Sequence, residues 1–200
     1  MLAYVFWHSP REGAAKAAYR DAMGGFHRAL REHRPAGFLA SACFSVSPCP
    51  WLPGADAYED WYLIQDFTAL GALNDAASAG PRREPHHHAA LLAGWGTGSV
   101  YRLYHPAADA PDLLELLAAA RWRCWLAKPD GVSYADYQGR LLRLAESAPA
   151  AVWQRQLTLG PAPEFCVHAA AGSAREFTRR ESLISRAEPV VSWASWKQGA

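Results

Sequence analysis

Apolar residues along the chain follow two alternating periods, one typical of strands and one typical of helices. Residues Leu2–His8 are nearly all apolar or aromatic, as in a strand that is covered on both faces. Ser9–Glu12 has the pattern of a capping box with proline at the first helical position, and it predicts a helix start. The helix is expected to bury the residues at helical spacing, which are Ala15, Tyr19, Met23, Phe26 and Leu30. His27 is expected to lie off this stripe, in solvent.

Further segments complete a first unit. Phe38–Ser47 alternates between two faces and predicts a half-polar strand. Tyr58–Asp66 predicts the next strand, and its last residue can cap a helix. A second helical run carries three consecutive histidines. The glycines of Gly96–Gly98 predict a turn into the strand Ser99–His105.

The same order of elements begins again after a linker. The predicted strands of this second unit are Arg121–Lys128, Val152–Leu159, Glu164–Ala170 and Val190–Lys197. One predicted helix begins at the capping box Ser133–Asp136. Another begins at Ser173 and is expected to bury Phe177 and Ile184. The order strand–helix–strand–strand–helix–strand therefore occurs twice.

This order predicts an α+β fold. Each unit is expected to form a four-stranded antiparallel sheet with two helices on one face, as in ferredoxin-like folds. The other sheet face stays apolar, so we expect two tandem βαββαβ units packed sheet to sheet as a fused α/β barrel. The expected boundaries are 1–106 for the first unit, 107–120 for a linker helix and 121–200 for the second unit.

Charge and cysteine usage narrow the function classes. The net charge of +1 and the scattered basic residues argue against nucleic acid or an anionic membrane as main partner. The start of the chain lacks a signal-peptide pattern, so a cytoplasmic protein with reduced thiols is expected. The four cysteines form no CxxC pair, and no Cys/His cluster has structural-zinc spacing. Cys43 is interpreted as a packed, inert thiol.

Three segments carry a family resemblance. They are Trp7–Pro10 at the first predicted helix start, Phe26–Leu30 at its end, and Trp125 with Lys128–Gly131 in the second half. With the element order, they resemble the dimeric α/β-barrel superfamily in its fused, tandem ferredoxin-like form. That group includes antibiotic-biosynthesis monooxygenase-like and EthD-like proteins, haem-degrading monooxygenases and chlorite dismutase-like haem proteins. The resemblance implies enzymes, haem binders and proteins of no known activity.

The histidine run His86–His88 is the first candidate site. Consecutive helical residues are about 100° apart, so the three side chains cannot face one way. His88 shares a face with Leu91 and Trp95 and is expected to point inward, with His87 at the margin and His86 in solvent. The resemblance to haem-degrading proteins implies His88, then His87, as axial ligand. The alternative is a satisfied histidine at a polar helix start. No metal site is expected from the triplet, which lacks an i, i+4 pair.

Polar residues on the predicted strands are the second candidate. Asp60, Arg102, Arg123, Arg155 and His168 interrupt apolar strands. If some point between the sheets, they would line a cavity with Trp7, Trp61, Tyr62, Trp125 and Trp153 as substrate-binding residues. His168 opposite an arginine, for which Arg102 is the candidate, would then be a proton-transfer group. The alternatives are large core aromatics, and charges at strand ends in water.

Three classes of function remain open at this stage. The first is a small-molecule-binding protein without established catalysis. The second is a cofactor-independent, monooxygenase-like enzyme acting on an aromatic or polyketide-like substrate, as the resemblance implies. The third is a haem protein that uses His88 or His87. No cofactor is expected in the first two. The expected partner is a small-molecule ligand, and the internal duplication permits a homodimer without requiring one.

Overall fold

The computed structural model describes residues 1–52, 56–106, 110–146, 150–170, 173–177 and 183–191. The first half of the chain contains β1 (Leu2–Pro10), α1 (Lys16–Glu32), β2 (Phe38–Ser47), β3 (Ala57–Ile64), α2 (Phe67–Ala77), the 3-10 turn η1 (Gly80–Arg82), α3 (Arg83–Leu92) and β4 (Ala93–His105). The second half contains α4 (Ala110–Ala119), β5 (Trp122–Leu126), α5 (Tyr134–Glu146), β6 (Ala150–Thr158), β7 (Phe165–Ala169), α6 (Ala174–Phe177) and β8 (Leu183–Val191).

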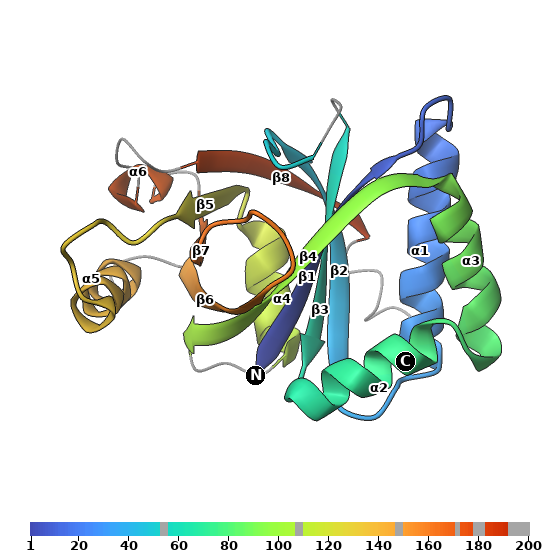
Figure 1. Cartoon of the computed structure of the whole chain (residues 1–200), viewed down its shortest axis with the longest axis horizontal. Helices are drawn as coiled ribbons and strands as arrows, with labels where there is room; N and C mark the ends of the chain where they lie inside the picture. The colour runs from blue at the N-terminus through green and yellow to red at the C-terminus, as the bar shows by residue number, and fades with distance from the viewer. Residues whose placement is uncertain (53–55, 107–109, 147–149, 171–172, 178–182, 192–200) are drawn as a thin grey trace.

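All eight strands join in one closed antiparallel barrel (Figure 1). The strand order is β1-β3-β2-β8-β5-β7-β6-β4, so each half contributes four neighbouring strands in the same internal order. Pairing of β2 with β8 and of β4 with β6 closes the barrel. The predicted α+β fold with two ferredoxin-like units is confirmed. The edge-to-edge pairing removes the free sheet edges that two stacked sheets would leave.

Four tryptophans fill the barrel. Trp7, Trp61, Trp125 and Trp153 are at most 1% exposed. Their rings contact one another, with centroids 5.2 Å apart for Trp7–Trp125 and 5.0 Å for Trp61–Trp153. The linker helix α4 adds its fully buried leucines to the same core: Leu113, Leu114 and Leu117. The four indoles therefore form the structural core of the barrel, as the alternative interpretation of the aromatic residues proposed.

A buried ion pair joins the two halves inside this core. Glu59 on β3 and Arg123 on β5 are both fully buried, and Nε of Arg123 donates to Oε1 of Glu59 at 3.2 Å. The Glu59 carboxylate also accepts hydrogen bonds from the indole nitrogens of Trp7 and Trp61. The guanidinium donates further to backbone carbonyls at the end of α4. Both buried charges are thus compensated by several partners, as burial requires.

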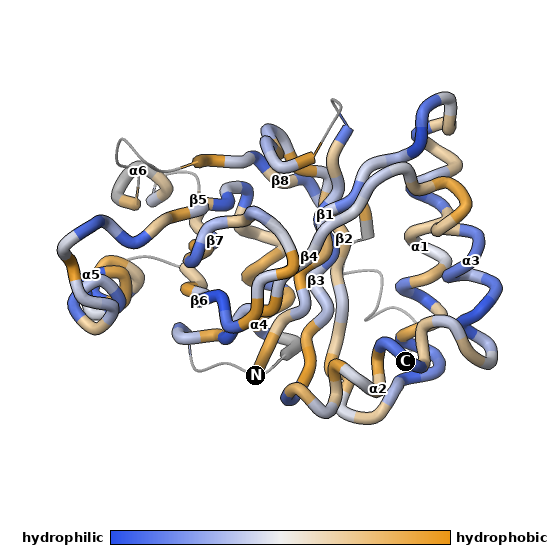
Figure 2. The backbone as a smooth tube through the Cα atoms, viewed as in Figure 1, coloured by the Kyte–Doolittle hydropathy of each residue, from blue (hydrophilic) through white to orange (hydrophobic). Residues whose placement is uncertain are grey.

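Helices cover the outer face of each half of the barrel. In Figure 1, α1, α2 and α3 lie on one side of β1–β4, and α5 and α6 lie on the far side, against the second half. None of the described helices has the length and apolar character of a membrane span. Hydrophilic and hydrophobic residues are mixed along α1, α3 and α5 (Figure 2).

The predicted helix start at Ser9–Glu12 is wrong. Strand β1 continues to Pro10, and α1 begins at Lys16 with no side-chain cap. The extension of β1 pairs with β4 as far as Ala93, and the backbone N–H of Arg11 donates to Leu92 O. These long-range hydrogen bonds outweigh the local capping signal.

The predicted turn at Gly96–Gly98 is also wrong, because these residues belong to β4. They lie across from the aromatic residues of β1. A Cβ atom on Gly96 would overlap the ring of Phe6, and one on Gly98 would lie 2.8 Å from the ring of Tyr4. The glycines therefore let aromatic side chains cross the strand at close range.

The last predicted strand and helix are misplaced. Helix α6 ends at Phe177, and Ile184 belongs to β8 rather than to a helix. Most of the predicted strand Val190–Lys197 lies outside the described residues. Strand β8 bridges the two halves by pairing with β2 and β5. This pairing involves residues far apart in sequence, so local helix signals could not predict it.

We expect the Glu59→Gln variant to lose about 3 kcal/mol of unfolding free energy, because it leaves the Arg123 guanidinium without its counter-charge in the barrel. Urea denaturation followed by circular dichroism measures this loss. The exposed pair Arg186–Glu188 offers a matched control. The Glu188→Gln variant should change stability by less than about 1 kcal/mol. Equal effects at both positions would contradict a dominant role for the buried pair.

Candidate functional site

A cavity of about 640 Å³ lies between the outer face of β1 and β3 and helices α1, α2 and α3. Its size is within the range of small-molecule sites. Its walls are mainly apolar and aromatic, and they include Tyr4, Phe6, Met23, Phe26, Tyr62, Leu70, Leu73 and Ala89. The polar lining residues are concentrated on one side of the cavity, where His8 and Asp60 of the strands lie near Tyr19 of α1. The cavity thus combines an apolar volume with one concentrated polar wall.

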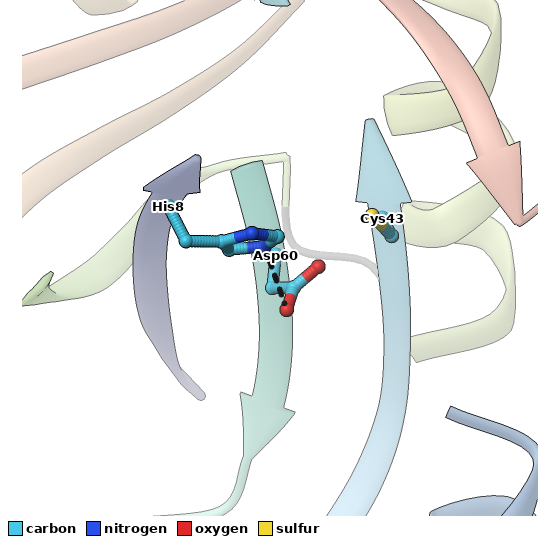
Figure 3. Close-up of side chains that lie close together, drawn as sticks. All are labelled: His8, Cys43 and Asp60. Atoms are coloured by element: carbon cyan, nitrogen blue, oxygen red, sulfur yellow. Dashed lines mark ion pairs between the residues drawn. The ribbon is translucent and has the colours of Figure 1, made fainter. Parts of the chain in front are cut away.

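Asp60 is the centre of the polar wall. Strand alternation sends Glu59 into the barrel and Asp60 to the helix-covered face, where it is fully buried. The Tyr62 hydroxyl donates to Oδ2 at 2.7 Å, and Nε2 of His27 lies 3.1 Å from Oδ1. Nε2 of His8 lies 3.2 Å from Oδ2 (Figure 3). One carboxylate is therefore surrounded by a phenol and two imidazoles.

This environment keeps Asp60 ionised. Burial by itself would raise the pKa of the carboxyl group. The electrostatic attraction of Asp60 to the imidazoles of His8 and His27, together with their hydrogen bonds, outweighs burial and holds the pKa of Asp60 below its ordinary value. A buried carboxylate therefore faces the cavity as an anion.

His8 connects Asp60 to Tyr19. Nδ1 of His8 lies 2.6 Å from the Tyr19 hydroxyl, and the imidazole stacks on the ring of Tyr58 at 5.7 Å. Burial, and next the charge of Asp60, raise the pKa of Tyr19, so its hydroxyl keeps the proton and can donate it to Nδ1. Tyr19, His8 and Asp60 form a hydroxyl–imidazole–carboxylate chain that begins at the cavity.

His27 supports the same carboxylate from α1. Its ring is fully buried, stacks on Tyr62 at 5.3 Å, and places Nδ1 2.6 Å from Oγ of Ser41. The prediction that His27 faces solvent is wrong. Met23 precedes it by four residues and Leu30 follows by three, so helical spacing does place it on the buried stripe.

The predicted catalytic pair, His168 and Arg102, does not come together. His168 is fully buried in the barrel, with its ring centroid 4.5 Å from that of Trp61. Arg102 is exposed, because Tyr101 before it points into the barrel and alternation turns Arg102 outward. Burial, and next the charge of Arg123, lower the pKa of His168. It is therefore a neutral core residue at pH 7.

The polar strand residues thus separate between the two faces of the barrel wall. Asp60 lines the helix-covered cavity, and Arg123 and His168 lie inside the barrel. Arg155 is partly buried and donates to the carbonyl of Ala162. Of the five aromatic residues expected to bind substrate, Tyr62 lines the cavity, and the four tryptophans pack inside the barrel instead.

The orientation predicted for the histidine run is wrong. His88 and His87 are exposed, whereas His86 is half-buried, lines the cavity and packs on Phe26 with centroids 5.2 Å apart. Helix α3 begins at Arg83, and its buried residue is Ala89, three positions after His86. The small side chain of Ala89, rather than the leucines after it, marks the inward face. Burial, and next His87, lower the pKa of His86.

The Tyr19–His8–Asp60 chain can accept a proton from a bound molecule. A carboxylate that orients an imidazole, and an imidazole that takes a proton from a hydroxyl, are the parts of general-base catalysis. Sequence patterns did not identify this chain, because its members lie on β1, α1 and β3. The available signal was Asp60 in an otherwise apolar strand, which required buried partners.

Comparison with known proteins supports the fold. A protein of Lactobacillus acidophilus NCFM provisionally assigned as a monooxygenase is 10% identical, with 95% of this chain and 94% of that chain covered and a TM-score of 0.50. A protein provisionally assigned as a chlorite dismutase is 10% identical, with 95% and 96% covered and a TM-score of 0.51. No family model and no curated protein sequence matches the chain. At such low identity, these structural similarities show a shared fold only. The function must be inferred from the residues of the site.

We expect His168 to make the protein less stable as pH falls below about 6.5, the ordinary pKa of histidine in an unfolded chain. Below that pH the unfolded state binds a proton that the folded state, with its lowered pKa, does not bind. The free energy of unfolding then falls by up to roughly 1.4 kcal/mol per pH unit. Urea titrations between pH 7.5 and 5 measure the slope.

The His168→Leu variant should show a shallower slope than the wild type over this range, whatever its absolute stability. The groups that face the His168 ring include Arg123, Cys166, Trp61 and Trp153. The exposed His88 provides the control, and the slope of His88→Ala should match the wild type. An unchanged slope in His168→Leu would contradict the prediction.

Proposed function

We propose that this protein binds a small, largely aromatic molecule in the cavity beneath α1–α3 and removes a proton from it without a cofactor. The observation that carries the proposal is the hydrogen-bonded contact between Tyr19 and His8 beside the buried Asp60 carboxylate, at the wall of an otherwise apolar cavity. The molecule is expected to carry an acidic O–H or C–H group next to an aromatic ring. Catalysis, rather than binding alone, is part of the proposal.

The cavity walls support an aromatic ligand. Rings of Tyr4, Phe6, Phe26 and Tyr62 border the volume, and adjacent rings stack on one another. Aromatic walls recognise planar apolar molecules by stacking and by burial of their surface. The anionic Asp60 disfavours a carboxylate or phosphate on the ligand near this wall, because like charges repel in a poorly solvated site.

Proton transfer is expected to pass through Tyr19. A ligand hydroxyl donates to the Tyr19 oxygen, and the Tyr19 hydroxyl passes its own proton to Nδ1 of His8. Asp60 then stabilises the imidazolium, as the carboxylate of a catalytic triad does. Tyr62 and His27 hold the carboxylate in place through their hydrogen bonds. The cavity wall around these groups is apolar, which strengthens the electrostatic contribution of Asp60.

A monooxygenase-like reaction is the form of catalysis that we favour. Loss of a proton turns the bound molecule into an electron-rich anion, which molecular oxygen can oxidise directly. For a methylene group between aromatic rings, the net change converts CH2 and O2 into C=O and H2O. One oxygen atom enters the carbonyl group, and the other leaves as water with the two hydrogens.

Haem fits the residues around the cavity less well. His88 and His87, the axial ligands implied by resemblance, are exposed. His86 does line the cavity, but no arginine or lysine lines it among the described residues. The two propionates of a haem would lie without a cation and near the Asp60 carboxylate. The proposal therefore includes no haem-dependent step.

The proposal also includes the domain organisation, the location and the oligomeric state expected from the sequence. We infer a fused tandem member of the α/β-barrel superfamily, with units at 1–106 and 121–200 and a linker helix between them. The support is the contiguous set of four strands from each half on either side of α4. A cytoplasmic location and the option of a homodimer remain predictions.

We expect 2-naphthol, a planar aromatic probe with an acidic hydroxyl, to bind the wild-type cavity. The Tyr19→Phe variant should bind it about fivefold more weakly, because one hydrogen bond is lost. Naphthalene, which lacks the hydroxyl, should bind both proteins equally. Fluorescence titration measures the four dissociation constants. Equal naphthol affinity in both proteins, or no binding to the wild type, would reject the proposal.

Three variants control for position and volume in this experiment. Tyr134 is an exposed tyrosine on α5, and Tyr134→Phe should leave naphthol binding unchanged. Ala89 lines the cavity and is buried, so Ala89→Phe should fill part of the volume and weaken both probes. His88→Phe places the same ring on the exposed face of α3 and should weaken neither probe.

A haem titration separates the cofactor-free proposal from the haem alternative. We expect no Soret band of bound haem that depends on His88 or His87, since both side chains face solvent. Absorbance spectra of the wild type, His88→Ala and His87→Ala with added haem make this test. The His86→Ala variant completes the series. A sharp Soret band lost only in His86→Ala would favour haem binding and count against the cofactor-free reaction.

A further inference from the structure

Three residues from neighbouring strands converge beside the cavity (Figure 3). Cys43 on β2 lies directly opposite Asp60 in the β2–β3 register, and His8 reaches the same point from β1. One donor atom of each residue lies within 4.8 Å of the other two: an imidazole nitrogen, a carboxylate oxygen and the thiol sulfur. All three side chains are buried. Three different donor types thus meet in a small volume.

The Nε2 atom of His8 has an unusual environment. It faces Oδ2 of Asp60 at 3.2 Å, and this contact within the described part of the chain lies beside the Cys43 thiol. The side chain is 1% exposed, so bulk water does not satisfy this atom. In Figure 3 the ring points toward the carboxylate. The nitrogen, the carboxylate oxygen and the nearby thiol sulfur are therefore close enough to share one ion.

We propose that His8, Cys43 and Asp60 bind a divalent transition-metal ion of the zinc class. Imidazole nitrogen, thiolate sulfur and carboxylate oxygen are all zinc ligands, and sites with three protein ligands keep a fourth position for water or substrate. Thiolate and carboxylate together neutralise the charge of the ion. His8 and Asp60 also line the cavity, so an ion bound by them would lie at the cavity wall.

Hydrogen bonds around the three ligands support this assignment. The Tyr19 hydroxyl lies 2.6 Å from Nδ1 of His8, so Nε2 is the imidazole nitrogen that faces Asp60 and would bind the ion. His27 holds Oδ1 of Asp60 at 3.1 Å and is itself held by Ser41. Such outer contacts orient metal ligands and raise affinity. The two ligands at the cavity wall are thereby fixed before an ion binds.

This inference rests on the donor atoms and does not depend on the proposed function. It does have a consequence for that function. A metal ion on Nε2 requires a proton on Nδ1 of His8, so the imidazole no longer accepts a proton from Tyr19. The ion would therefore inhibit the cofactor-free proton transfer and act as a regulator of the site.

Cobalt titration of the chelator-treated full chain tests the proposal. Co²⁺ bound to a thiolate gives a charge-transfer band in the near ultraviolet, and a four-coordinate site adds visible bands. We expect both signals to saturate at one equivalent and to disappear when Zn²⁺ is added. Cys43→Ala should lose the charge-transfer band, and Asp60→Asn should weaken Co²⁺ binding at least about tenfold. Circular dichroism checks that each variant is folded.

Cys124→Ala provides the matched control. Cys124 is also a buried free cysteine, it lies on β5 and it belongs to a different core cluster, so this variant should keep the full signal. No thiolate band in the wild type, a band that survives Cys43→Ala, or a band lost in Cys124→Ala would each overturn the proposal. Naphthol titration of the same metal-free samples reports on the cavity separately. Failure of one experiment therefore leaves the other interpretable.

Discussion

Two adjacent carboxylates in the middle of β3 point to opposite faces of the barrel wall, and both are fully buried. A buried carboxylate is stable only with compensating charges or hydrogen bonds. Glu59 meets this requirement inside the barrel through Arg123 and two indoles. Asp60 meets it outside the barrel through two histidines and a tyrosine. One pair of residues thus links the halves of the fold and creates the polar wall of the cavity.

The Glu59–Arg123 pair also explains why the barrel interior is structural. Arg123 reaches from β5 to the β3 carboxylate and to the carbonyls at the end of α4. This arrangement holds the linker helix against the four packed indoles. The charged and aromatic side chains in the barrel interior pair with and pack against one another. The cavity lies on the other face of the barrel wall, beneath α1–α3, and there we propose the ligand site.

The polar wall of that cavity supports two kinds of chemistry through one imidazole. Nδ1 of His8 contacts Tyr19, and Nε2 faces the carboxylate and the thiol. The proposed proton transfer uses the first nitrogen, and the proposed metal binding uses the second. Because the tautomer of a neutral imidazole links the two nitrogens, the two uses exclude each other. In these two proposals, the shared histidine makes the proton transfer sensitive to the ion.

Local periodicity was sufficient for the element order and hence for the fold class. Alternation along Phe38–Ser47 and the helical stripe from Tyr19 to Leu30 both correspond to observed elements. The predicted ends of helices and strands were wrong where strands distant in sequence pair, as at Pro10 and in β8. Local signals carry no information about such partners. The resemblance to α/β-barrel proteins agreed with the observed topology but did not identify the residues of the site.

The candidate site shows the same division. The sequence by itself determined that Asp60 interrupts an apolar strand, whereas the prediction that His27 lies off the buried stripe was wrong. Only the tertiary structure decided that Asp60 faces the helices, where His8, Tyr19 and Cys43 reach it, while His168 faces the barrel interior. The physical reason is that alternation divides a strand into two faces without stating which face is covered by helices. That choice depends on barrel closure, which couples residues far apart in the chain.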